Sequence, residues 1–193
     1  GLEVNDKRFM IGIVSRLTDQ KGFDLIACVM EQLCWGETQI VILGTGDPKY
    51  ESMFRYYADK YRGKVSANIY YSEELSHKIY AAADAFLMPS LFEPCGLSQL
   101  MSLRYGTVPI VRETGGLKDT VWPYNEYENT GTGFSFANYN AHEMLHVVDY
   151  AKHIYFDKRR DWNTIAERAM RVDYSWANSA RKYEQLYDSM LGY

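Results

Sequence analysis

One carboxylate stands between two glycine-bearing loops in the middle of this chain. Glu93 lies in the first loop, which begins at Pro89 after an apolar stretch, and Thr114–Gly116 follows the next apolar stretch. A helical pattern of apolar residues comes after each loop. Free N–H groups at the start of a helix bind anions, and glycine lets the backbone come close to a ligand. The spacing predicts a pocket for a phosphorylated ligand, with one acidic group near its reactive end.

Two cations in an earlier polar loop, Ser15–Gly22, suit the same ligand. Arg16 and Lys21 follow the first apolar stretch of the chain, so they are expected at the same edge of a parallel sheet. Arginine can hold a phosphate group with two hydrogen bonds, and lysine adds a compact charge, which suits a diphosphate. Tyr71 ends a third expected strand at this edge and could stack on a base. Each feature alone is equally typical of an ordinary surface loop; the prediction depends on their combination.

The elements that must position these residues alternate between strand and helix. The expected strands are Phe9–Val14, Gln39–Leu43, Val65–Tyr71, Ala85–Met88, Val108–Val111 and Gly133–Phe136. The expected helices are Asp24–Leu33, Tyr50–Tyr61, Glu73–Ala83 after a Ser72 cap, Gly96–Arg104, a segment after Gly116, Ala141–Phe156, Lys158–Ala169 and Trp176–Met190. This alternation predicts an α/β fold, a doubly wound parallel sheet with helices on both faces. Ligands bind outside the carboxyl ends of the strands in such sheets, where the loops above lie.

Composition limits the kinds of partner. The chain has 193 residues, enough for one domain, and a formal net charge of −4, so its overall charge does not favour nucleic acid or an anionic membrane. No apolar run approaches the length of a bilayer span. Its three cysteines are an odd number without the spacing of metal ligands, which is typical of reduced thiols in a cytosolic protein.

Two other motifs offer competing interpretations. Gly44-Thr45-Gly46 is similar to a dinucleotide-binding fingerprint but lacks the third glycine and follows the second strand. The segment His142–His146 matches the H-E-x-x-H pattern of zinc proteases. Helical spacing, however, places both histidines on the polar face of their helix, and Asn140 with Glu143 forms a capping pair. We therefore expect no nicotinamide, flavin or zinc site.

Four segments together resemble a known family. They are Ser15–Gly22 with its Arg and Lys, FEPCGL at Phe92–Leu97, YGTVP at Tyr105–Pro109 and TGGLKD at Thr114–Asp119. The chain is similar over nearly its whole length to the C-terminal domain of bacterial glycogen synthase and plant starch synthase. The resemblance implies a Rossmann-like half of a GT-B glycosyltransferase. It also implies transfer of glucose from a nucleotide sugar to the non-reducing end of an α-1,4-glucan, with retention of configuration and without a metal or other cofactor.

The resemblance also implies roles for single residues. Arg16 and Lys21 would bind the donor diphosphate and help catalysis, and Glu93 would lie at the donor glucose and be essential. Cys95, Gly96 and Leu97 would line the sugar and phosphate, the last two through backbone N–H groups. Thr114 and Gly115 would bind the distal phosphate in the same way, and Tyr71 would stack on adenine. ADP binding would then be nearly independent of Glu93.

Two departures from the family pattern matter. Related glycosyltransferases carry a second glutamate eight positions after the first, where this chain has Met101, as in the synthase branch. The family's N-terminal domain has a Lys-x-Gly-Gly motif, which this sequence lacks. We therefore expect residues 1–193 to be a single donor-binding domain without that N-terminal domain. Its closing helix, within residues 175–193, would pack on the missing half.

The expected function is thus the donor-binding half of a glycogen or starch synthase that uses ADP-glucose, located in the bacterial cytoplasm or, in a plant, the plastid. The expected partners are ADP-glucose or ADP, an α-1,4-glucan and the N-terminal domain of the same enzyme. The isolated domain is expected to bind nucleotide without catalysis. A stand-alone nucleotide-binding module and a GT-B enzyme that uses UDP-glucose remain open alternatives; a sugar phosphorylase and a zinc protease are more distant ones.

Overall fold

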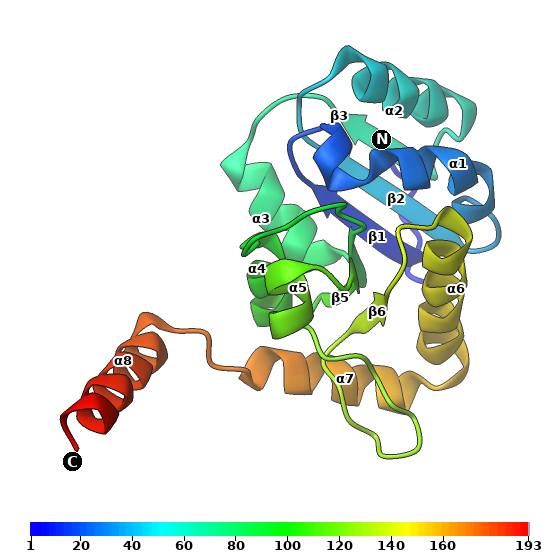
Figure 1. Cartoon of the computed structure of the whole chain (residues 1–193). Helices are drawn as coiled ribbons and strands as arrows, with labels where there is room; N and C mark the ends of the chain where they lie inside the picture. The colour runs from blue at the N-terminus through cyan, green and yellow to red at the C-terminus, as the bar shows by residue number, and fades with distance from the viewer. Residues whose placement is uncertain (193) are drawn as a thin grey trace.

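A computed structural model describes residues 1–192 and contains one six-stranded parallel sheet. The strands lie in the order β3-β2-β1-β4-β5-β6 (Figure 1). Their bounds are β1 Phe9–Val14, β2 Thr38–Leu43, β3 Val65–Asn68, β4 Ala85–Met88, β5 Val108–Arg112 and β6 Phe134–Phe136. The predicted fold class, an α/β doubly wound parallel sheet, is confirmed.

Helices cover both faces of the sheet. Their bounds are α1 Phe23–Leu33, α2 Pro48–Lys60, α3 Glu73–Ala82, α4 Ser98–Tyr105, α5 Gly115–Thr120, α6 Ala141–Asp157, α7 Arg159–Arg171 and α8 Trp176–Leu191, with a short 3₁₀ turn η1 at Asp19–Lys21. One large apolar cluster joins the sheet to α1, α2, α6 and α7. Two smaller clusters join the opposite face to α3 and to α5. These six helices therefore bury apolar side chains against the strands, as their periodicity requires.

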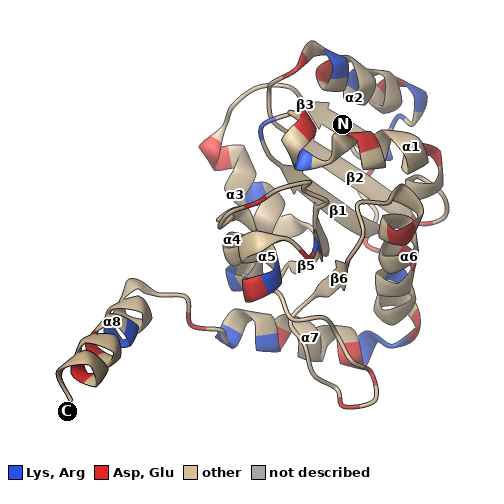
Figure 2. Ribbon diagram, viewed as in Figure 1, with Lys and Arg blue, Asp and Glu red and all other residues tan. Residues whose placement is uncertain are grey.

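The strands are apolar because both of their faces are covered. All six residues of β2 are buried, and neither β1 nor β2 contains a charged residue. Apart from Arg112 at the end of β5, the charged residues lie on the helices and connecting loops (Figure 2). The aromatic rings of Phe9, Tyr155 and Trp162 meet edge to face, which packs α6 and α7 against the start of β1.

The strand order reverses between β1 and β4, because β1 pairs with β2 on one side and with β4 on the other. The chain from β1 runs outward through β2 and β3, then returns to β4 and continues through β5 and β6. Loops that leave two neighbouring strands in opposite directions open a crevice at this switch point. The β1–α1 and β4–α4 loops flank it.

Most expected elements are present, with small shifts at their ends. The largest shift concerns the third strand, which was expected to reach Tyr71 but ends at Asn68. Tyr71 lies in the loop before α3 and is 85% exposed, so it is a loop residue and not a strand residue. Ser72 caps α3 as expected, because its hydroxyl accepts a hydrogen bond from the N–H of Leu75. The fourth helix begins at Ser98, so Gly96 precedes it.

The last helix, α8, stands away from the body of the molecule (Figure 1). It contains no buried residue, although Tyr183, Leu186, Tyr187 and Met190 are apolar or aromatic and largely exposed. The segment before α8 is attached to the body, since the Tyr174 hydroxyl donates to the carbonyl of Thr120 at 2.8 Å. None of the helices within residues 1–192 combines the length and apolar character needed to cross a membrane.

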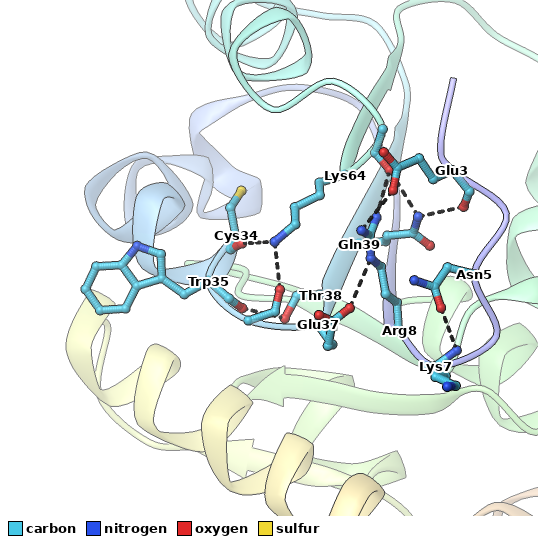
Figure 3. Close-up of polar contacts among 12 residues, drawn as sticks. Glu3, Asn5, Lys7, Arg8, Cys34, Trp35, Glu37, Thr38, Gln39 and Lys64 are labelled. Atoms are coloured by element: carbon cyan, nitrogen blue, oxygen red, sulfur yellow. Dashed lines mark hydrogen bonds and ion pairs between the residues drawn. The ribbon is translucent and has the colours of Figure 1, made fainter.

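The amino edge of the sheet is closed by polar contacts between the first residues of the chain and the turns around them (Figure 3). Arg8 forms ion pairs with Glu3 at 2.8 Å and with Glu37 at 3.2 Å. The buried amide of Gln39 donates to the carbonyls of Glu3 and Gly63, at 2.8 and 3.1 Å. These contacts fix the residues that precede β1 across the starts of β2 and β3.

Candidate functional site

Two loops at the switch point are joined through their backbones. The N–H of Leu91 donates to the carbonyl of Gln20 at 2.9 Å, and the amide of Gln20 donates to the carbonyl of Phe92 at 3.0 Å. Gly22 makes this close approach possible: its φ is +76°, and a Cβ there would lie 2.0 Å from the carbonyl oxygen of Pro89. The β1–α1 loop therefore carries Arg16 and Lys21 to the β4–α4 loop.

The third loop, between β5 and α5, closes on the same place. The N–H of Gly116 donates to the carbonyls of Glu93 and Pro94, at 3.1 and 3.2 Å. A Cβ on Gly116 would lie 2.1 Å from the carbonyl oxygen of Cys95, so only glycine fits there without movement of the backbone. The two glycine-bearing loops singled out in the sequence thus form one interlocked structure.

Lys21 and Glu93 form an ion pair at the centre of this structure. Lys21 Nζ lies 2.5 Å from Glu93 Oε2, and their side chains are only 16% and 9% exposed. The hydroxyl of Ser90 also approaches Glu93 Oε2, at 3.4 Å. From the sequence, Lys21 is expected at the diphosphate and Glu93 at the sugar, as separate groups. The structure brings the two charges into direct contact.

The β4–α4 loop presents backbone donors. The N–H groups of Gly96 and Leu97 make no hydrogen bond within residues 1–192, and they precede the first turn of α4. Gln99 fixes the β4–α4 loop, because its buried amide nitrogen donates to the carbonyls of Cys95 and Gly96, at 2.9 and 3.0 Å. The N–H groups of Gly96 and Leu97 thus have no partner among residues 1–192, which is the arrangement that anion binding at a helix start requires.

The β5–α5 loop differs in part from the expectation. The N–H of Gly115 has no partner among the described residues, but the N–H of Thr114 donates to the carbonyl of Arg112 at 2.9 Å. Thr114 can therefore offer its hydroxyl to a phosphate but not its N–H. The reason is local: the chain turns sharply at the end of β5, and this turn uses the Thr114 N–H.

A cavity of about 390 Å³ lies beside these loops. Its walls contain Arg16, Tyr71 and Leu97, together with Tyr70, His77 and Met101. Tyr71 belongs to this wall although it lies beyond the end of β3. The cavity thus has aromatic side chains near one cation and the free N–H of Leu97, which suits a ligand with a flat ring joined to an anion.

Several supporting residues were not found from the sequence. Arg112 donates to the carbonyls of Ser90 at 2.8 Å and Leu91 at 2.5 Å, and so holds the loop that carries Glu93. His77 shares a hydrogen bond with the hydroxyl of Tyr105 at 2.9 Å, beside the cavity. The only available signal was position: Arg112 ends a strand at the carboxyl edge. Its contact with backbone carbonyls has no sequence pattern.

The H-E-x-x-H segment lies at the start of α6. His142 and His146 are exposed, while Met144 and Val148 face the core. Asn140 Oδ1 accepts hydrogen bonds from the N–H groups of His142 and Glu143. Within residues 1–192 no group of three or more His, Cys, Asp or Glu side chains could hold a metal ion.

Glu143 itself turns back toward the end of β6. Its carboxylate accepts from the N–H of Ala137 at 2.7 Å and from the side-chain amide of Asn138 at 2.9 Å. The hydrogen bond from the Asn138 side chain, assisted by the backbone N–H groups, lowers the pKa of Glu143 below its ordinary value. The Glu143 carboxylate therefore has its hydrogen-bond partners within the protein.

Known proteins are similar to this chain in sequence. Residues 1–169 match the family model described as glycosyl transferases group 1. A glycogen synthase from Lachnospira eligens is 71% identical over 190 residues, which cover 98% of this chain and 40% of that protein. A glycogen synthase from Clostridium acetobutylicum is 57% identical over the same share of each chain. The chain therefore spans about 40% of the length of the curated relatives it matches.

Solved structures show the same fold. The catalytic domain of starch synthase IV from Arabidopsis thaliana, bound to ADP and acarbose, has a TM-score of 0.88 and 34% identity; the match covers all of this chain and 41% of that one. Sucrose-phosphate synthase from Thermosynechococcus elongatus has a TM-score of 0.71 over 98% of this chain, with 21% identity. The first likeness extends to sequence, whereas the second concerns the fold alone.

Proposed function

The chain belongs to the group 1 glycosyltransferases, and we propose that it is the donor-binding part of an enzyme that transfers glucose from ADP-glucose to the non-reducing end of an α-1,4-glucan. The observation that carries the proposal is the convergence of three loops at the switch point. They place Lys21, Glu93 and the free N–H groups of Gly96 and Leu97 beside a cavity lined by tyrosines. Glycogen synthases among the relatives and an ADP-bound starch synthase among the solved structures support this choice.

We assign the diphosphate to the positive side of this site. Arg16 and Lys21 bind it and stabilise the charge that develops as it leaves, which is the principal electrostatic task in such a transfer. The N–H groups of Gly96, Leu97 and Gly115, with the hydroxyl of Thr114, complete the contacts. Because side-chain cations and backbone donors supply the countercharge, we propose that the site needs no metal or other cofactor.

The sugar and base take opposite ends of the same site. Glu93 and Cys95 lie where the glucose would sit, with Glu93 orienting it through its hydroxyl groups. Tyr71, 85% exposed at the cavity wall, stacks on adenine. A single carboxylate at the sugar, with Met101 eight positions after it, agrees with the glycogen synthase branch.

The rest of the enzyme is proposed to face this site. The relatives are about two and a half times as long as the matched segment, since it covers 40% of them. We propose that their remaining domain completes a GT-B cleft, holds the glucan acceptor and packs against α8, whose aromatic and apolar side chains are exposed. Much of the rate of a two-substrate reaction comes from holding both substrates in a dry cleft, so residues 1–193 alone bind nucleotide without transferring glucose at an enzymatic rate.

Calorimetry with ADP, UDP and NAD tests the donor assignment. ADP is expected to bind more tightly than UDP, and NAD not measurably. Arg16→Ala and Lys21→Ala should each weaken ADP binding, roughly threefold to tenfold for an exposed or partly exposed charge. Lys7→Ala removes an exposed cation from the amino edge and serves as the matched control, with unchanged affinity (Figure 3).

Equal affinities for ADP and UDP, or a preference for UDP, would remove the ADP-glucose assignment and favour a UDP-glucose enzyme. A second assay incubates the chain with labelled ADP-glucose and glycogen. Incorporation at a rate typical of enzymes would contradict the proposed need for the remaining domain.

A further inference from the structure

The Lys21–Glu93 ion pair differs from every other ion pair in the described part of the chain. It is the one pair within residues 1–192 in which both side chains are mostly buried, whereas each of the others has at least one partner that is substantially exposed. It also lies where the proposed function places the diphosphate and the sugar. Its position suggests a role in choosing between ligands.

The backbone holds the two side chains together. Lys21 ends the short turn that is fixed to the β4–α4 loop by the contacts of Gln20, and Gly22 lies against the carbonyl of Pro89. The Glu93 carbonyl accepts from the N–H of Gly116. Since both loops are fixed, a phosphate that approaches Lys21 must also approach the Glu93 carboxylate. The Lys21 ammonium group therefore cannot contact a phosphate without the Glu93 carboxylate nearby.

The charges of Lys21 and Glu93 then decide how tightly a phosphate binds. A lysine ammonium has three hydrogen-bond donors, so Lys21 can contact a phosphate while it keeps Glu93. The phosphate, however, meets an ammonium whose charge is already balanced, and it meets a second negative group close by. Like charges that are mostly buried repel one another more than they do in bulk solvent. Free ADP therefore binds at an electrostatic disadvantage.

A donor sugar changes this balance. Glucose hydroxyl groups can donate hydrogen bonds to the Glu93 carboxylate, which accepts only from Lys21 and Ser90 among residues 1–192. Such bonds to an ionised group are stronger than ordinary ones and offset its repulsion of the phosphate. ADP alone offers the carboxylate no donor in that position.

We propose that Glu93 is a specificity-determining residue that weakens the binding of free nucleoside diphosphate through its ion pair with Lys21, and so favours the nucleotide sugar over the released nucleotide. This inference rests on the proposed function, because it assumes that the diphosphate binds at Lys21. It replaces the expectation from the sequence that ADP binding is nearly independent of Glu93. Removing the carboxylate should tighten ADP binding.

The test compares the unmodified chain with Glu93→Gln by calorimetry, using ADP, ADP-glucose, inorganic diphosphate and adenosine. Glutamine keeps an oxygen that can accept from Lys21 but removes the charge. ADP and inorganic diphosphate should bind about three to ten times more tightly to the variant, as expected for one partly buried charge. Adenosine should bind equally to both, and the preference for ADP-glucose over ADP should decrease.

Two further variants serve as controls. Glu113→Gln removes another carboxylate beside the phosphate-binding loop, one that accepts from the Ser135 hydroxyl at 2.8 Å and pairs with no cation among residues 1–192. It should leave the ADP affinity within about twofold, because Glu113 is half-buried, is not paired with Lys21, and its charge is partly screened by solvent. Glu93→Ala should tighten ADP binding in the same direction as Glu93→Gln. Because removing one member of this mostly buried pair costs stability, a thermal melt checks that both variants are folded at the temperature of the calorimetry.

The outcomes separate this inference from the proposed function. ADP affinity that is unchanged or weaker in both Glu93 variants, with normal adenosine binding, would overturn this inference alone. An equal gain in Glu113→Gln would also overturn it, because the effect would then be general and not specific to the ion pair. Binding of none of the four probes by any variant would overturn both.

Discussion

The two edges of the sheet use polar groups in opposite ways. At the amino edge, Arg8 and Gln39 are occupied by ion pairs and carbonyls from the same chain (Figure 3). At the carboxyl edge, the N–H groups of Gly96, Leu97 and Gly115 have no partner among residues 1–192. Both edges contain glycines with left-handed backbones, tight turns and charged side chains. What distinguishes the candidate site is therefore the set of donors left free.

The difference separates stability from binding. A buried polar group that loses its partner costs free energy of unfolding, so a closed network contributes mainly to stability. A loop whose N–H groups have no partner in the protein contributes less to stability, and a ligand can accept hydrogen bonds from those N–H groups. Changes at the amino edge should therefore affect folding alone, and changes at the carboxyl edge should affect ADP binding.

The largest effect is expected from Gly22→Ala. Gly22 has a φ of +76°, and an added Cβ would lie 2.0 Å from the Pro89 carbonyl oxygen, so the β1–α1 and β4–α4 loops must separate. The left-handed backbone and the clash together should lower the free energy of unfolding by about 2–5 kcal/mol. Separation of the loops should also abolish measurable ADP binding. Denaturant unfolding and calorimetry measure the two effects.

Gly36→Ala is the matched control at the amino edge. Gly36 has a similar φ of +66°, but an added Cβ would meet nothing within 4 Å. It should lower the free energy of unfolding by only about 1–2 kcal/mol, the cost of the left-handed backbone, and leave ADP binding unchanged. If Gly22→Ala bound ADP like Gly36→Ala, the contact between the two loops would not be needed for the site.

The second effect is expected from Gln39→Leu. Gln39 is 1% exposed, and its amide serves the carbonyls of Glu3 and Gly63. Leucine leaves two carbonyls without this donor, which should lower the free energy of unfolding by about 1–3 kcal/mol. ADP affinity should not change, because the residue lies at the opposite edge from the candidate site. A loss of ADP binding at a temperature where the variant is folded would contradict the separation of the two edges.

The fold could be predicted well from the sequence, because strands that are buried on both faces are recognisable as short apolar runs. The apolar strands, the Ser72 and Asn140 caps and the glycine-bearing loops were all recognised from residue type and spacing. The third strand was extended by three residues, to Tyr71, because its tyrosines have a high strand propensity. The structure ends the strand at Asn68, whose side chain donates instead to the carbonyl of Ile42 at 3.1 Å.

The site was predictable only in part. Residue types indicated Arg16, Lys21, Glu93 and the free N–H groups near Gly96, because anion binding needs cations and helix starts. Contacts between loops from different strands could not be predicted, since they depend on the sheet order. The Lys21–Glu93 ion pair joins residues 72 positions apart, and the use of the Thr114 N–H by a turn has no signature in residue type.

The smallest effect concerns a carboxylate at the carboxyl edge that does not belong to the site. Glu143 accepts from the N–H groups of Ala137 and Asn138 and from the Asn138 side chain, so it resembles the closed amino edge in its chemistry. Its pKa is lowered, chiefly by the hydrogen bond from the Asn138 side chain. Glu143 thus tests whether a polar group affects ADP binding because it lies at this edge or because it has no hydrogen-bond partner within the protein.

Glu143→Gln should lower the free energy of unfolding at pH 7 by about 0.5–1 kcal/mol, since the lost hydrogen bonds are charge-assisted but close to solvent. Because the folded-state pKa of Glu143 lies below its ordinary value, its contribution is complete above that value and is lost as the pH falls through the folded-state pKa. The difference between Glu143→Gln and the unmodified chain should therefore shrink as the pH falls below about 4.5. Glu128→Gln, which removes an exposed carboxylate from the loop before β6, is the control. Its free energy of unfolding should equal that of the unmodified chain both at pH 7 and below about pH 4.5. ADP affinity should be unchanged in both variants; a weaker affinity in Glu143→Gln would mean that polar groups already occupied by the protein also shape the binding edge.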